Sequence, residues 1–110
     1  MPWWNAARKL RAGQQVRFRA LGSSMSPTIR SFQPVEVWPV RPELVETGDI
    51  VAAEVGGRTF LHRVSRVDGG RVEIADARGR VNGWTGYEGL LGICVSIGGR
   101  PVPSAAAKAR

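Results

Sequence analysis

The stretch Val16-Arg17-Phe18-Arg19-Ala20 decides the fold class, because its apolar and basic side chains alternate with a period of two. This period places successive side chains on opposite faces of a strand. Further apolar runs of strand length follow at residues 35–40, 49–55, 59–67, 71–75 and 90–97. Glycines separate most of these runs and fit tight turns, since glycine tolerates positive φ angles. We therefore expect a mainly β protein whose closely spaced strands form a small curled sheet or a barrel.

The N-terminal residues 1–12 predict one short helix. Good helix formers occupy most of this segment, Asn5 is a candidate N-cap, and Gly13 offers a stop. We expect Trp3 and Trp4 to seat the helix on the core, with a membrane interface as the alternative.

Residues 13–97 form the predicted β domain, and the whole chain of 110 residues has the size of one domain. Residues 98–110 contain prolines and a run of alanines without an apolar period. We expect this last segment to be a flexible C-terminal tail.

The formal net charge of +7 comes mainly from arginines scattered along the chain. Such a charge suits nucleic acid, an anionic membrane surface or an acidic partner, but no basic run or basic-aromatic stripe favours one of them. Nucleic-acid binding is therefore a secondary hypothesis. No segment has the roughly 18 consecutive apolar residues of a membrane span, and the N-terminus has no apolar signal-peptide region. We expect a soluble, cytoplasmic protein without an integral membrane anchor, and leave peripheral membrane association open.

Cys94 is the only cysteine, which excludes an intramolecular disulfide. It lies in the apolar run of residues 90–97, and most cysteines in such runs are buried packing residues. No cluster of cysteine and histidine has the spacing of a zinc site. We expect neither a metal nor a cofactor.

A catalytic serine needs a nearby base and a site for the oxyanion, because its hydroxyl is a poor nucleophile at neutral pH. The chain has one histidine, His62, while its two lysines, Lys9 and Lys108, lie near the termini. If a serine is activated, His62 is the candidate base. A lone histidine on a strand is, however, more often a packed structural residue.

Four segments together resemble one peptidase family. Gly22-Ser23-Ser24-Met25-Ser26-Pro27-Thr28-Ile29 resembles the Ser-Met-x-Pro-Thr-Leu box of type I signal peptidases, and Gly48-Asp49-Ile50-Val51 is similar to their Gly-Asp-Ile-Val segment. Leu61-His62-Arg63-Val64 resembles the His-Arg-Val motif of the archaeal and endoplasmic-reticulum branch, where histidine replaces the general-base lysine of bacterial enzymes and LexA-type repressors. Ala75-Asp76 falls where the family has Gly-Asp. The resemblance covers residues 13–97 and implies the signal-peptidase and LexA catalytic core.

The resemblance also implies roles for individual residues. Ser24 would be the nucleophile, and His62 would take its proton and return it to the leaving amine. Asp76 would orient or electrostatically support the imidazolium. The backbone N–H of Ser24, helped by the hydroxyl of Ser23, would bind the oxyanion.

Three positions depart from the family pattern. Gly22 stands where the bacterial enzymes have a helper serine, Asn82 stands at the second acidic position of the histidine branch, and Ser31-Phe32-Gln33 replaces a Gly-Asp. An amide cannot act as a carboxylate, so a full triad would depend on Asp76. That residue is equally typical of a turn before Ala77-Arg78-Gly79.

We therefore predict a serine endopeptidase that cleaves a protein or peptide substrate, either in trans or in itself. The substrate would lie extended along sheet edges near residues 16–21 and 60–62. The alternatives are a non-catalytic binding module on the same fold and a basic accessory domain that binds nucleic acid. Retention of both Ser24 and His62 favours the peptidase.

Overall fold

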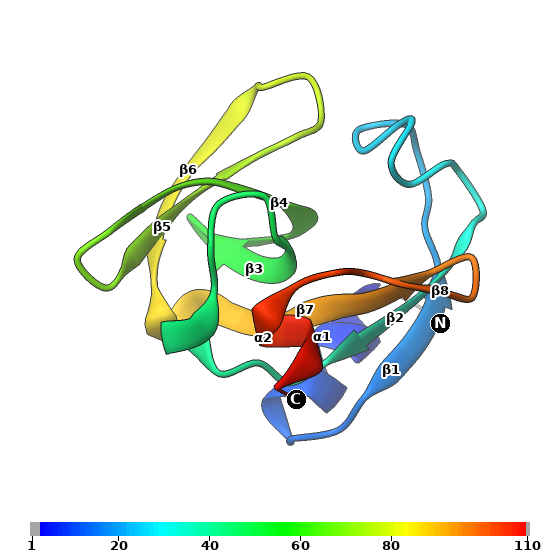
Figure 1. Cartoon of the computed structure of the whole chain (residues 1–110), viewed down its shortest axis with the longest axis horizontal. Coiled ribbons are helices and arrows are strands. Elements are labelled where there is room, and N and C mark those ends of the chain that lie inside the picture. The colour runs from blue at the N-terminus through cyan, green and yellow to red at the C-terminus, as the bar shows by residue number, and fades with distance from the viewer. Residues whose placement is uncertain (1–2, 110) are drawn as a thin grey trace.

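Eight antiparallel strands form one sheet in the computed structural model, which describes residues 3–109 (Figure 1). The strands are β1 (Val16–Arg19), β2 (Pro34–Trp38), β3 (Ile50–Val55), β4 (Arg58–Asp68), β5 (Arg71–Ala75), β6 (Val81–Gly86), β7 (Leu90–Ile97) and β8 (Arg100–Pro101). The helices are α1 (Trp3–Arg11) and α2 (Ala105–Lys108), with short 3-10 helices η1 (Pro42–Leu44) and η2 (Tyr87–Gly89). The prediction of a mainly β protein is confirmed.

The sheet curls on itself but stays open. Its strand order is β1-β2-β7-β3-β4-β5-β6, and β8 pairs with β7. The two end strands, β1 and β6, share no ladder in the described part of the chain. β6 nevertheless returns toward β3, since a Cβ built on Gly83 would lie 3.0 Å from Val55 Cγ1. This curl places β4 opposite the segment that follows β1 (Figure 1).

The strands agree closely with the apolar runs of the sequence, and β5 and β7 match the predicted ranges residue for residue. β6 is not predicted from the sequence, because Gly83 and Gly86 interrupt its apolar alternation and Val81 is half-exposed. It forms because its backbone pairs with β5 over residues 81–86. Backbone pairing of this kind leaves little trace in side-chain pattern.

The main core lies inside the curl and joins strands that are distant in sequence. Its fully buried members include Val51 on β3, Val64 on β4, Val72 and Ile74 on β5, and Ile93 on β7. Burial of β-branched side chains from four strands fixes the register of the sheet, since a slip by one residue would turn them toward water.

Helix α1 covers a second, smaller core. Ala6 and Leu10 are four residues apart, so they lie on one face of the helix. Both are buried and pack with Val16, Val37 and Leu91. Within residues 3–109, no helix has the length and apolar character needed to cross a membrane.

Of the two predicted ends of this helix, the N-terminal one is wrong and the C-terminal one is confirmed. α1 begins at Trp3, so Asn5 lies inside the helix and the prediction that it caps the N-terminus is wrong. The predicted stop is confirmed, because the helix ends at Arg11 and Gly13 follows with a φ of 82°. The described part of the structure excludes residues 1–2 and the side chains of Trp3 and Trp4. The prediction that these two tryptophans seat the helix on the core therefore lies outside it.

The C-terminal segment is packed, and the prediction of a flexible tail over residues 98–110 is wrong for its described part. β8 pairs with β7, and Ser104 Oγ accepts a hydrogen bond from Ala107 N–H at 3.3 Å to cap α2. Ala106 and Ala107 are each 1% exposed and belong to the main core. A helix of four residues is too short to show an apolar period, which is why the sequence does not reveal it.

Candidate active site

The loop after β1 presents Ser24 to solvent on a buried support. Ser24 is exposed, while the next residue, Met25, and then Ile29 are buried beside Cys94. Ile29 N–H donates to the Met25 carbonyl at 2.8 Å, which closes one helical turn between these two anchors. Methionine therefore follows the serine for a structural reason, because its side chain fixes the loop to the core.

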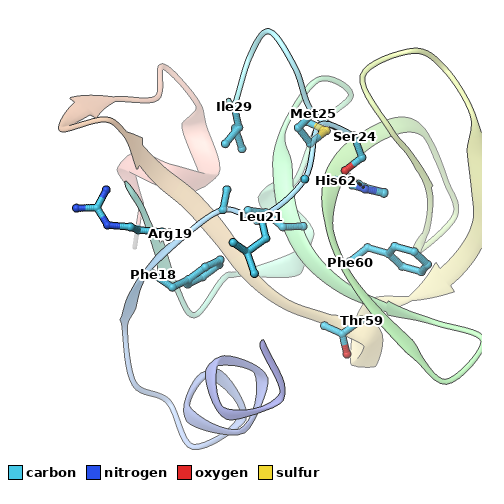
Figure 2. A pocket seen from close by; sticks show the side chains of 12 residues that line it. Phe18, Arg19, Leu21, Ser24, Met25, Ile29, Thr59, Phe60 and His62 are labelled. Atoms are coloured by element: carbon cyan, nitrogen blue, oxygen red, sulfur yellow. Dashed lines mark hydrogen bonds between the residues drawn. The ribbon is translucent and has the colours of Figure 1, made fainter. Parts of the chain in front are cut away.

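His62 lies on β4 and faces this loop. Its ring is buried, and Nε2 lies 3.0 Å from Ser24 Oγ. Figure 2 shows the two side chains next to one another at one end of a cleft. The Ser24 hydroxyl can donate to Nε2 when that nitrogen carries no proton. The structure thus brings together the two residues predicted to act as nucleophile and base.

Asn82 occupies the other side of the His62 ring. Asn82 Oδ1 lies 2.6 Å from His62 Nδ1. The ladder between β5 and β6 passes from Ile74 opposite Gly83 to Ala75 opposite Val81, which leaves Asn82 as the extra residue of a β-bulge. Bulges next to active sites redirect a side chain. The sequence marks Asn82 only as a departure from the family pattern, and the bulge is what directs it toward His62.

Asp76 is buried, but the partner of His62 Nδ1 is Asn82, so the predicted role of Asp76 in orienting the ring has no hydrogen bond behind it. Its Oδ1 accepts hydrogen bonds from the backbone N–H groups of Arg78 and Arg80, each at 2.9 Å. The bond from Arg80 is the main reason why the pKa of Asp76 is lowered, and the bond from Arg78 and the charges of Arg80 and His62 add to it. The geometry is that of a turn-forming aspartate.

The turn of residues 76–80 is also bonded to the loop that carries Ser24. Ala77 N–H donates to the Ser24 carbonyl at 2.9 Å. Arg63, which follows His62 on β4, donates from Nε to the Asp76 carbonyl at 2.9 Å. One turn thus contacts both the loop that carries Ser24 and the strand that carries His62. The sequence places Arg63 in a motif and Ala77 in a turn, but it does not predict these two contacts, since each acceptor is a backbone carbonyl.

A cleft of about 260 Å³ extends from Ser24 and His62. Two segments line it: residues 18–22 with Ser24, Met25 and Ile29 on one side, and residues 59–62 on the other (Figure 2). Along residues 60–62, β4 pairs with β3, whereas its ladder with β5 begins only at Arg63. The second edge of β4 at residues 60–62 is therefore available for main-chain hydrogen bonds beside Ser24 and His62.

Asp49 and Cys94 have structural roles. Asp49 Oδ2 accepts from Glu46 N–H at 2.9 Å and so caps the turn before β3. Burial raises the pKa of the Cys94 thiol to about 12, so this cysteine stays protonated and inert. Ser23 is exposed beside Ser24, and its carbonyl accepts from Ser26 N–H. No three described residues among His, Cys, Asp and Glu are grouped as a metal site requires.

Comparisons with models of protein families, with curated proteins and with solved structures found no match. The assignment of function therefore depends on the geometry of Ser24, His62 and Asn82 together with the motifs that contain them.

Proposed function

We propose that this protein is a serine endopeptidase similar to the histidine branch of type I signal peptidases and LexA-like peptidases. The observation that carries the proposal is the 3.0 Å contact between Ser24 Oγ and His62 Nε2, with Nδ1 bonded to Asn82 Oδ1. An exposed serine, a buried imidazole and a polar group behind the ring form the arrangement that activates a serine hydroxyl.

The contact between Ser24 and His62 supplies the nucleophile and the group that carries the proton through the reaction. Ser24 Oγ attacks the carbonyl carbon of the scissile peptide bond, and its proton moves to His62 Nε2. The carbonyl electrons move to the oxygen, where the Ser24 N–H and the Ser23 hydroxyl would stabilise the oxyanion. The oxyanion collapses, the C–N bond breaks, and the leaving amine takes the proton from Nε2. Water then gives a proton to Nε2 and attacks the acyl ester, and that proton returns to Ser24 Oγ.

The cleft supports a substrate that binds in extended form. The available edge of β4 at residues 60–62 can add a peptide strand through main-chain hydrogen bonds. The segment after β1 lies on the opposite side of the same cleft, with Leu21 77% exposed. The lining is mainly apolar, with Phe18, Met25 and Leu61 among its members, so the bound side chains would be uncharged.

A fluorophosphonate probe tests the proposal without knowledge of the natural substrate. We expect the native protein to be labelled on Ser24, identified by mass spectrometry, and Ser24→Ala to remain unlabelled. Ser31→Ala is the matched control, because it removes the hydroxyl of another exposed serine near this loop. A library of extended peptides, digested by the wild type and Ser24→Ala, then identifies the bond cleaved.

Two results would reject this proposal. One is peptide cleavage that persists unchanged in Ser24→Ala. The other is binding of peptides in the cleft with neither labelling nor cleavage, which would make the protein a non-catalytic binding module.

A further inference from the structure

Two polar residues lie near the pair of Ser24 and His62, and only one of them is bonded to the histidine. Asn82 Oδ1 contacts His62 Nδ1 at 2.6 Å, whereas the Asp76 carboxylate accepts two N–H groups of its own turn. We propose that they are positioning residues with separate tasks: Asn82 fixes the tautomer of His62, and Asp76 fixes the place of Ser24 through the turn of residues 76–80. The catalytic meaning of this division rests on the proposed peptidase activity.

The task of Asn82 follows from the hydrogen-bonding capacity of an amide oxygen, which only accepts. With Oδ1 facing the ring at 2.6 Å, the contact is a hydrogen bond when His62 Nδ1 carries the proton and donates it. Nε2 is then the unprotonated nitrogen, as it must be to receive the Ser24 proton. An acidic residue at this position would fix the same tautomer, and it would also place a negative charge beside the ring. Asn82 supplies the orientation alone.

The task of Asp76 follows from a series of contacts that leads to the nucleophile. Its carboxylate binds the N–H groups of Arg78 and Arg80, which closes the turn. Closure aligns Ala77 N–H with the Ser24 carbonyl, 2.9 Å away. If the carboxylate is removed, the turn loses two bonds and the Ser24 carbonyl loses the fixed position of its donor. Asp76 therefore acts on the serine through backbone groups.

The first experiment determines the His62 tautomer by 15N NMR in the wild type, Asn82→Asp and Asn82→Ala. Val81→Ala is the matched control, because it changes the exposed neighbour on the same bulge. We expect Nδ1–H in the wild type, Asn82→Asp and Val81→Ala, since each keeps an acceptor oxygen at position 82. In Asn82→Ala the His62 ring should no longer favour the Nδ1–H tautomer. This variant should react with the fluorophosphonate roughly 10²- to 10⁴-fold more slowly than the wild type. A wild-type ring protonated at Nε2 would overturn the assignment, because the amide would then be the donor.

The second experiment compares Asp76→Asn with Asp76→Ala. Asparagine keeps an oxygen that can accept from Arg78 and Arg80, and alanine does not. We expect Asp76→Asn to react within roughly tenfold of the wild type and Asp76→Ala at least about 10²-fold more slowly, since a displacement of about 1 Å can cost that much. Equal losses in both variants would overturn the assignment, because the charge of Asp76 would then matter and not its acceptor atoms.

These outcomes can be separated from the failure of the proposed function. An unlabelled native protein would reject the peptidase, yet the NMR tautomer would still decide the task of Asn82. The melting temperatures would still decide the task of Asp76 in the turn: a loss in Asp76→Ala that Asp76→Asn restores supports it, and a similar loss in both contradicts it.

Discussion

Ser24 Oγ and His62 Nε2 lie 3.0 Å apart although 38 residues separate them in the chain. The loop after β1 holds the serine, and β4 holds the histidine on the opposite side of the cleft. A displacement of either support would lengthen the contact that carries the proposed chemistry. The backbone of the loop is therefore as relevant to activity as the side chains.

A substitution at Gly22 tests whether activity depends on the backbone of the loop after β1. It adopts a φ of 86° two residues before Ser24, and a Cβ added to it would meet nothing within 4 Å, so Gly22→Ala introduces backbone strain without a steric clash. We expect a loss of about 1–2 kcal/mol in the free energy of unfolding. We also expect fluorophosphonate labelling to slow, because relief of the strain would shift Ser24 away from His62.

Gly57→Ala is the matched control for this prediction. Gly57 has a φ of 79° and equal free space, but lies in the turn between β3 and β4. Both variants should melt at lower temperature, and only Gly22→Ala should be labelled more slowly. Equal labelling rates in the two variants would show that the loop tolerates the change without moving Ser24.

Two buried carboxylates predict how stability depends on pH. Hydrogen bonds from Arg66 and Ser65 lower the pKa of Glu73, and the N–H groups of Arg80 and Arg78 lower that of Asp76. Because both values are lower in the folded state than in the unfolded one, the unfolded chain binds protons first as the pH falls. The resulting stability is present above the unfolded values, near 4.5 and 3.8, and is lost below them.

Melting curves between pH 7 and pH 3 check this expectation. The wild type should lose melting temperature more steeply below about pH 4.5 than Glu73→Gln or Asp76→Asn, because those variants have no carboxylate to protonate. Glu43→Gln, which changes an exposed carboxylate, is the control and should follow the wild type. Parallel curves for all four proteins would contradict the prediction.

The strands, and the two residues that meet in the cleft, could be predicted from the sequence because both leave local signals. Alternating side chains identified the stretch that forms β1, and the Ser-Met-x-Pro-Thr box together with a single histidine pointed to Ser24 and His62. The structure adds the distance between the two residues, which no local pattern contains. It depends on the curl of the sheet, and that curl results from core packing.

The separate roles proposed for Asn82 and Asp76 could not be predicted from the sequence, because they depend on a β-bulge and on hydrogen bonds to backbone groups. Whether a strand residue faces the core or a neighbouring ring depends on register, and one extra residue in β6 changes the direction of Asn82. The Asp76 turn was an open alternative in the sequence, and its bond to Ser24 joins two backbone groups that have no sequence signature.

Cys94 provides a check on the packing beneath the loop that carries Ser24. It is fully buried beside Met25 and Ile29, and burial raises the pKa of its thiol to about 12. We expect no alkylation by iodoacetamide at pH 8 in the native protein and complete alkylation in denaturant. Rapid alkylation of the native protein would show that this part of the core opens readily, and the loop that holds Ser24 would then lack its support.

Because the C-terminal segment is packed, we expect substitutions of two neighbouring alanines on α2 to differ strongly in their effect on stability. Ala106 is 1% exposed in the main core, whereas Ala105 is exposed. Ala106→Asp would bury a charge or force its neutralisation, so we expect a loss of several kcal/mol in the free energy of unfolding, on the order of 3 or more. Ala105→Asp should change it by less than about 0.5 kcal/mol, because surface substitutions usually do. Urea unfolding of both variants measures the difference, and equal stabilities would mean that α2 is detached from the core in solution.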